Sequence, residues 1–247
     1  MKKILSANDL KILAVIAMTV DHTAFLLVDK SCLLYYFMRL FGRLTAPIMV
    51  FLLTEGYRHT RNRKKYLGRL FMFAGISQPI YFQFVYGNLP VNTADFFLHW
   101  NVMLSLALGL LVMILFDSEK IQTAPSLILL GVLISLAHFG DWSYLIPAWT
   151  IIFFCYYNRD TQKMIVLFVL ASVTLQTLLY LKEFDSFALF SFQYGTLLAL
   201  IPISMYNGER GNVRHKSLNR WFFYIYYPAH MVVLLIIQAC LKIFAQS

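Results

Sequence analysis

Charged residues are scarce in this sequence. Only 13% of its 247 residues are Asp, Glu, Lys or Arg, whereas 60% are hydrophobic and the mean hydropathy is +0.65. A soluble domain is closer to one quarter charged and one half apolar. So little charge leaves too little polar surface to cover a soluble globule. The composition therefore excludes soluble, disordered, collagen-like and disulfide-scaffold proteins and predicts an integral membrane protein.

Cysteine and glycine motifs are also missing. Cys32, Cys155 and Cys240 lie far apart, and no CxxC or Cys/His spacing is present, so neither a disulfide framework nor a metal site is expected. No Walker or Rossmann glycine pattern occurs. The N-terminal lysines lead into no small-residue cleavage site, so the first apolar stretch is expected to be a retained helix.

Long apolar stretches, in contrast, are abundant. A helix needs about 20 apolar residues to cross the hydrocarbon. With no linker, low-complexity run or clear repeat, the sequence predicts a single integral-membrane domain over residues 1–247. Its expected fold is all-α, a polytopic transmembrane helix bundle of about nine spans, in which the sixth, with Pro147, is broken or tilted. The nine stretches are residues 8–28, 35–56, 66–86, 99–116, 123–139, 143–157, 162–181, 187–205 and 219–244.

The basic residues predict the orientation. The net charge is +9, from 21 Lys and Arg against 12 Asp and Glu. With a cytoplasmic N-terminus, 16 of the 21 basic residues fall in the inside segments, which is the bias that cytoplasmic loops carry. We therefore expect a multi-pass protein of the cell (inner, cytoplasmic) membrane with an external C-terminus. Its basic excess is explained by the lipid bilayer and not by nucleic acid.

Two ionisable residues, Asp21 and His22, interrupt the first span. His22 lies about 20 Å from the inner end, where an ionisable side chain is costly and usually functional. Adjacent helical residues point about 100° apart, so Asp21 is expected to pair with another helix and not to support His22 directly. Either His22 is a general base with Asp21 as an orienting charge, or both make interhelical hydrogen bonds that fix the packing.

The second span carries Arg39 and Arg43, which share a helix face because they are four residues apart. Arg39 either reaches the outer surface or contacts a substrate. Arg43 is about a turn deeper and needs a partner, and Asp21 is the nearest acidic residue by depth. Gly42 allows a neighbouring helix to approach closely. Pro47 frees a backbone carbonyl.

Further polar residues lie in later spans. His230 is about 16 Å from the inner end of the last span, two residues after Pro228 and close to Tyr227. Gln78 lies at mid-depth in the third span, and Asn101 lies near the outer face. Packing hydrogen bonds explain most such neutral residues. The alternative is that Gln78, Asn101 and Tyr227 contact a substrate. Deep histidines in two spans, together with a deep arginine, predict one polar cavity.

The densest run of charge is the inner loop RHTRNRKKYLGR at 58–69. One interpretation is a topology anchor that faces anionic lipid. The other is a docking patch for a polyanion such as a nucleotide phosphate. Its candidate ligands are Arg58, Lys64, Lys65 and Arg69.

Three segments of the chain resemble the TraX family, membrane proteins that acetylate the N-terminus of conjugative pilin. They are LKILAVIAMTVDH at 10–22, the stretch 41–70 that begins FGRLTAPIM, and FYIYYPAH at 223–230. The family pattern is Asp-His in the first span, Gly-Arg followed by Pro in the second, and Tyr-x-x-His in the last. The middle of the chain, about 110–215, carries no such motif. The matching residues here are Asp21, His22, Gly42, Arg43, Pro47, Tyr227 and His230.

The resemblance implies an acetyltransferase that takes an acetyl group from cytosolic acetyl-CoA and needs no metal. The acceptor is an amine or hydroxyl at or across the membrane, on a small molecule, on a glycan, or at a pilin or peptide N-terminus. His22 would take the acceptor's proton, with Asp21 or Arg43 orienting it. Arg43, Asn101 or His230 would stabilise the thioester oxyanion, and the basic loop would bind CoA phosphates. Direct transfer and an acetyl-His22 intermediate both stay open.

Two other classes of protein also use intramembrane charges. A secondary transporter needs them together with broken helices, although the odd number of spans and the lack of an inverted repeat count against it. A structural component of a conjugation or secretion machine would tolerate the loss of both deep histidines. An acyltransferase would not.

Overall fold

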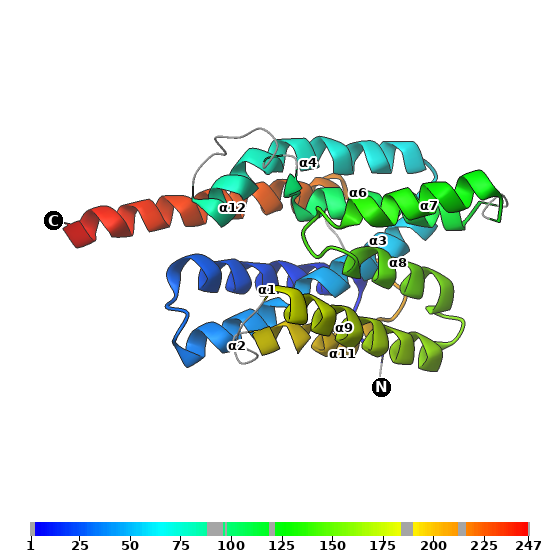
Figure 1. Ribbon diagram of the computed structural model, residues 1–247, viewed down its shortest axis with the longest axis horizontal. Coiled ribbons are helices and arrows are strands. Elements are labelled where there is room, and N and C mark those ends of the chain that lie inside the picture. Colours follow the sequence, from blue (N-terminus) through cyan, green and yellow to red (C-terminus); the bar gives the residue numbers. More distant parts are fainter. Residues whose placement is uncertain are drawn as a thin grey trace. The chain divides into compact units, whose positions relative to one another are not determined.

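The computed structural model describes residues 3–87, 96, 98–118, 122–183, 190–211 and 216–246, with the backbone alone at 182, 183, 216–220 and 246. Within these residues every regular element is a helix, apart from two isolated bridges, Leu5 with Tyr206 and Trp100 with Gly140. The predicted all-α fold class is confirmed (Figure 1). The helices are α1 (Ala7–Leu27), α2 (Leu33–Gly42), α3 (Thr45–His59), α4 (Arg63–Tyr86), α6 (Val102–Phe116), α7 (Ala124–Ala137), α8 (Leu145–Tyr156), α9 (Thr161–Glu183), η1 (Ser191–Ala199), α11 (Leu200–Ser204) and α12 (Lys216–Gln246).

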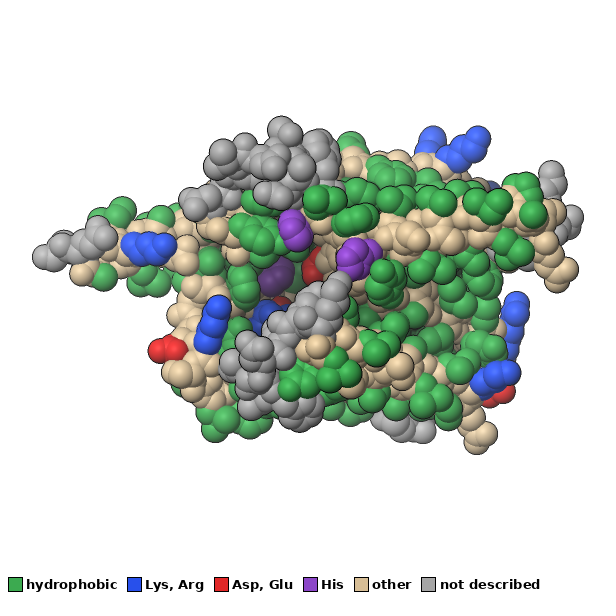
Figure 2. All heavy atoms as spheres, in the orientation of Figure 1, with side chains coloured by type: hydrophobic (Ala, Val, Ile, Leu, Met, Phe, Trp, Pro, Cys, Tyr) green, Lys and Arg blue, Asp and Glu red, His purple; other side chains and the backbone are tan. Residues whose placement is uncertain are grey.

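Helix length and surface composition both indicate a membrane protein. Four helical stretches of the described chain are long and apolar enough to cross a bilayer: Ala7–Leu27, Leu33–His59, Thr161–Leu181 and Trp221–Ala245. Three further apolar helices, α6, α7 and α8, are shorter. Large hydrophobic side chains such as Leu181 and Phe244 are 72% and 77% exposed. Hydrophobic side chains predominate on the face drawn in Figure 2, and so much exposed apolar surface needs a lipid environment.

The chain divides into two compact units. The first unit comprises Met1–Ile48, Ile76–Leu89 and Phe184–Ser247, and the second comprises Met49–Gly75 and Pro90–Glu183. That the whole chain forms a single domain stays a prediction.

The first unit is built around α1. Ser6 and Asp9 form a capping box, in which each side chain accepts from the other residue's backbone N–H, so the helix begins at Ala7. Helix α1 packs against both α2 and α12, and α2 packs against η1. Figure 1 shows α1 and α2 side by side. Two faces of α1 are therefore covered by different helices.

The expected second span, 35–56, lies within the candidate span Leu33–His59, where the helix is interrupted near its middle. Helix α2 ends at Gly42 and α3 begins at Thr45. Pro47 has no N–H to donate to the carbonyl of Arg43, so the α-helical ladder is interrupted at this point. The chain closes the gap with a tighter bond, from Leu44 N to Phe41 O at 3.2 Å.

The expected eighth span, 187–205, is also not a regular α-helix. Residues 184–189 lie outside the described residues. After them the chain forms the 3₁₀ helix η1 and then α11, which has only five residues. Pro202 falls in the first turn of α11 and does not explain the 3₁₀ geometry of the residues before it. The described part of this expected span is therefore helical, but most of it is 3₁₀ helix.

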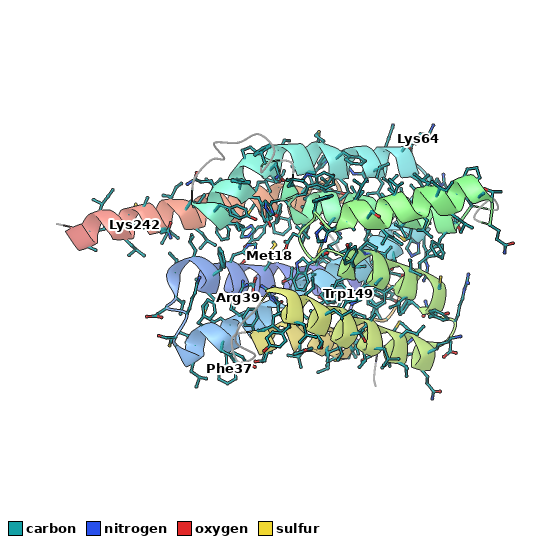
Figure 3. All side chains as sticks on the ribbon, in the orientation of Figure 1. Met18, Phe37, Arg39, Lys64, Trp149 and Lys242 are labelled. Atoms are coloured by element: carbon teal, nitrogen blue, oxygen red, sulfur yellow. The ribbon has the colours of Figure 1, made fainter. Side chains whose placement is uncertain are left out.

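The second unit is held by aromatic packing. Trp149 on α8 is fully buried, and its Nε1 donates to Ser172 Oγ on α9 at 2.9 Å. Its ring stacks on Phe168, with centroids 5.6 Å apart. Figure 3 labels Trp149 on α8, which packs against α9. Helix α8 is not broken by Pro147, because this residue falls in the first turn, where no helical hydrogen bond is lost.

Candidate functional site

Helices α1 and α2 are joined by a buried ionic cluster. Arg39 Nη1 donates to Asp21 Oδ2 at 2.8 Å, and Arg43 Nη2 donates to the same oxygen. The two arginines reach one carboxylate because residues four apart lie on one helix face. The side chain of Arg39 is only 12% exposed, so it pairs with Asp21 and does not extend to the surface (Figure 3). The pairing of Arg43 with Asp21, predicted from their similar depth, is confirmed.

The cluster depends on a close approach of the two helices at Gly42. A Cβ atom built on Gly42 would overlap the carboxylate of Asp21. Glycine is therefore needed at this position to seat the acidic side chain against α2. The prediction that Gly42 allows a neighbouring helix to approach closely is confirmed.

Aromatic rings surround the two guanidinium groups. Arg39 lies over the rings of Phe25 and Phe192, with centroids 5.4 and 5.0 Å away. Arg43 lies 5.5 Å from the Phe192 centroid and donates to Gln193 Oε1 at 3.2 Å. Ring faces attract cations, and this attraction is stronger where water is excluded. Together, one carboxylate and two arginines make the cluster net positive.

A pair of histidines joins α1 to α12. His22 Nδ1 lies 2.6 Å from His230 Nε2, within hydrogen-bonding distance. The rings are nearly parallel, at 5°, with centroids 4.9 Å apart. Phe84 on α4 covers His22 at a centroid distance of 5.1 Å. We call His22 and His230 the histidine pair.

Polar contacts occur at three levels along the interface between α1 and α12, which we call the α1–α12 seam. Thr19 Oγ1 donates to Val15 O at 2.8 Å and lies 2.6 Å from Tyr226 Oη, so the tyrosine hydroxyl donates to it. The histidine pair comes next along the seam. Farther on, Gln238 Nε2 donates to Leu26 O at 3.3 Å. Asp21 and His22 therefore serve different helices, as their 100° separation predicts.

The other candidates for substrate contacts are divided between the two units. Tyr227 is buried in the first unit, with its ring centroid 6.0 Å from that of His230. Gln78 is also buried in the first unit, on α4. Asn101 belongs to the second unit, where it caps α6: its side chain accepts from Met103 N at 3.0 Å and donates to Ala74 O at 2.8 Å. This capping gives Asn101 a structural task.

The four basic candidates of the inner loop differ in their surroundings. Arg58 Nη2 donates to Phe154 O at 2.9 Å, at the last turn of α8, and Nη1 donates to Glu55 at 3.3 Å. Arg69 is half-buried over the Tyr66 ring, 5.3 Å from its centroid. Lys64 and Lys65 are exposed in the first turn of α4, and Figure 3 shows Lys64 projecting from that end. Arg58 therefore stabilises α8, whereas the two lysines face outward.

Sequence reasoning did not identify three partners of the site: Thr19, Tyr226 and Gln193. Two of them carry a helical signal. Thr19 precedes His22 by three residues and Tyr226 precedes His230 by four, so each lies on the face of its histidine. Within the described residues, no group of three or more His, Cys, Asp or Glu is placed to hold a metal ion.

Fold and site together define an all-α membrane protein with a buried ionic cluster and a histidine pair inside its spans. The chain belongs to the TraX family: the family model described as TraX protein matches residues 6–238. All residues of the cluster and the pair lie within this match. A relative from Dichelobacter nodosus, described as probable fimbrial assembly protein FimC, serogroup H1, is 34% identical over 235 residues. The match covers 93% of this chain and 94% of that protein. No solved structure matches the chain.

Proposed function

We propose that this protein is an integral-membrane acetyltransferase that moves an acetyl group from acetyl-CoA to an amine acceptor. The observation that carries the proposal is the histidine pair, which lies partly buried in the same unit as the ionic cluster. An imidazole that takes and returns a proton is the commonest general base in enzymes. Ionisable side chains within spans are costly and commonly mark a functional site. Membership of the TraX family supports the same conclusion.

The proposed reaction is a simple acyl transfer. The acceptor amine attacks the thioester carbonyl of acetyl-CoA while His22 takes one proton from its nitrogen. The new C–N bond forms, the C–S bond breaks, and the protonated His22 gives its proton to the CoA thiolate. The products are the acetylated amine and CoA thiol. The net positive charge of Arg39 and Arg43 favours the negative charge that develops on the carbonyl oxygen.

For the donor we propose the exposed end of α4 as the phosphate site. Lys64 and Lys65 are exposed there, and Arg69 lies about one turn farther along the same helix. Lysine ammonium groups bind phosphate through charge-assisted hydrogen bonds. Arg58 is occupied with the carbonyls of α8 and Glu55, so we assign it a structural role.

Replacing Lys64 and Lys65 together by Gln is expected to raise the KM for acetyl-CoA at least about tenfold with little change in kcat. A hydrogen bond to a charged group contributes about 1.5–3 kcal/mol, and exposure to salt reduces this. Initial rates at varied acetyl-CoA measure the effect. Lys163→Gln, at the first turn of α9, is the matched control and should leave the KM unchanged. An unchanged KM in the double variant would leave the loop as a topology anchor only.

The proposed acceptor is the N-terminal amine of a pilin subunit. The name of the Dichelobacter relative, a probable fimbrial assembly protein, supports this choice. Purified protein in nanodiscs is incubated with acetyl-labelled acetyl-CoA and a peptide carrying the pilin N-terminus. Label in the peptide with equal release of CoA thiol is expected. A hydroxyl acceptor is tested in parallel with a glycan. No acceptor-dependent CoA release with any of them would refute the proposed function.

We propose the cytoplasmic membrane as the location, with the 58–69 loop facing the cytoplasm, where acetyl-CoA is available. In a background with Cys155 and Cys240 replaced by Ser, native Cys32 lies exposed between α1 and α2. It should react with an impermeant maleimide added outside spheroplasts. Asn62→Cys, with Cys32 also replaced, should react only after the membrane is opened. Equal labelling of both positions in intact spheroplasts contradicts the topology.

A further inference from the structure

We infer that His22 acts through its Nε2 atom, and that His230 is a positioning residue that fixes this tautomer of His22. The inference rests on the proposed function and adds to it the identity of the reactive atom. A neutral imidazole carries its proton on one nitrogen and a lone pair on the other, so hydrogen-bond partners decide which nitrogen is basic. The α1–α12 seam supplies those partners.

The tautomer of His230 is set by a contact within α12. Its Nδ1 lies 2.9 Å from the backbone carbonyl of Tyr226. A carbonyl oxygen only accepts, so Nδ1 of His230 carries the proton and donates it. In a neutral imidazole the other nitrogen, Nε2, then holds a lone pair. His230 therefore presents an acceptor toward α1.

The tautomer of His22 is set in turn by its contact with His230. Its Nδ1 lies 2.6 Å from His230 Nε2, which is an acceptor, so His22 Nδ1 carries the proton. The lone pair of His22 is thus left on Nε2. Among the described residues Nε2 has no hydrogen-bond partner. This nitrogen is the one available to a substrate.

Aromatic packing fixes the orientation of both rings. The Tyr226 ring stacks on His230 at 6°, with centroids 5.2 Å apart, and its hydroxyl is held by Thr19. Tyr226 thus holds His230 through its backbone carbonyl and its ring. Asp21 does not fill the orienting role, because its Oδ2 accepts from Arg39 and Arg43. His230 therefore occupies the place that an orienting carboxylate has in many general-base sites.

The arrangement allows a complete proton cycle at one atom. Nε2 of His22 takes the proton of the attacking amine, while Nδ1–H stays hydrogen-bonded to His230. The lone pair on His230 Nε2 accepts this hydrogen bond throughout and stabilises the imidazolium form of His22. Nε2 then gives this proton to the CoA thiolate. His230 neither gains nor loses a proton during the cycle.

The tautomer is tested by ¹⁵N NMR on histidine-labelled protein in nanodiscs. Subtracting the spectrum of His22→Gln assigns the His22 signals. We expect Nδ1 of His22 to show the shift of a protonated ring nitrogen and Nε2 that of an unprotonated one. In His230→Leu the two His22 tautomers should interconvert. A wild-type His22 protonated on Nε2 alone overturns the inference.

The positioning role is tested with two substitutions of His230. The amide oxygen of His230→Gln can accept from His22 Nδ1, whereas His230→Leu offers no acceptor. We expect kcat to fall less than about tenfold in His230→Gln and at least about 100-fold in His230→Leu, with the KM for acetyl-CoA unchanged in both. Equal losses in the two variants would overturn the positioning role, as would near-normal kcat in His230→Leu.

A control separates this role from packing along the seam. Gln238→Leu removes another α1–α12 hydrogen bond, about 12 Å farther along α12, and should leave kcat unchanged. The two proposals fail independently. If NMR shows the assigned tautomer but no acceptor is acetylated, the proposed function is wrong and the tautomer assignment stands. If acetyl transfer is observed but His22 carries its proton on Nε2, the tautomer assignment is wrong and the proposed function stands.

Discussion

His22→Gln is expected to lower kcat for acetyl transfer by about 10²–10⁴-fold, the usual cost of losing a general base. Glutamine still forms a hydrogen bond to His230 but cannot take a proton. The α1–α12 seam is therefore expected to persist while the chemistry stops. Initial rates with saturating acetyl-CoA and acceptor measure the loss. An acetyl-His22 intermediate would make the loss larger, because the nucleophile itself would be missing.

The matched control is His59→Gln, which makes the same substitution at a side chain that is 74% exposed. Its kcat should equal that of the wild type. Thermal unfolding of His22→Gln should stay close to wild type, which separates a chemical defect from misfolding. Near-normal turnover in purified His22→Gln would refute the mechanism and make His230 the next candidate base.

Asp21→Asn is expected to lower the free energy of unfolding by about 3–5 kcal/mol. Removing one partner of a buried ion pair leaves the other charge uncompensated, and here two guanidinium groups lose the same carboxylate. The substitution keeps the shape of the side chain, so the loss reports charge and not packing volume. Denaturant unfolding in detergent micelles measures it.

Asp29→Asn provides the comparison, because Asp29 lies in the exposed turn after α1 and accepts from the backbone and side chain of Ser31. Its effect should stay within about 0.5 kcal/mol. Adding Arg39→Gln to Asp21→Asn removes one uncompensated charge and should restore part of the lost stability. Equal free energies of unfolding for the wild type and the Asp21→Asn variant would show that the cluster contributes nothing to the folded state.

Several features of the fold and site follow from the sequence because they rest on local geometry. The apolar stretches predict the helices, and the depth of Arg43 predicts its pairing with Asp21. The spacing of Arg39 and Arg43 predicts that they share a helix face, although the pairing of Arg39 with Asp21 was not predicted. Gly42 predicts the close approach. Each of these predictions uses only the periodicity of a helix and the free-energy cost of placing a charge in hydrocarbon.

Other features depend on contacts that no local pattern contains. His22 and His230 are separated by 208 positions, so their contact depends on how α12 packs against α1. The 3₁₀ geometry of η1 also could not be predicted from the sequence, because an ordinary α-helix has the same apolar composition. Arg58 looked like a phosphate ligand because its neighbours are basic. The carbonyls of α8 that hold it are about 95 positions away.

The ionic cluster also bears on how the chain enters the bilayer during synthesis. Asp21 and its two arginines belong to consecutive helices, 18 and 22 positions apart. Two arginines on an isolated helix would be costly to insert. With α1 already present, α2 can enter as half of a helical hairpin whose charges are partly neutralised. The histidine pair, in contrast, needs α12. The proposed catalytic site can therefore form only after α12 has been synthesised.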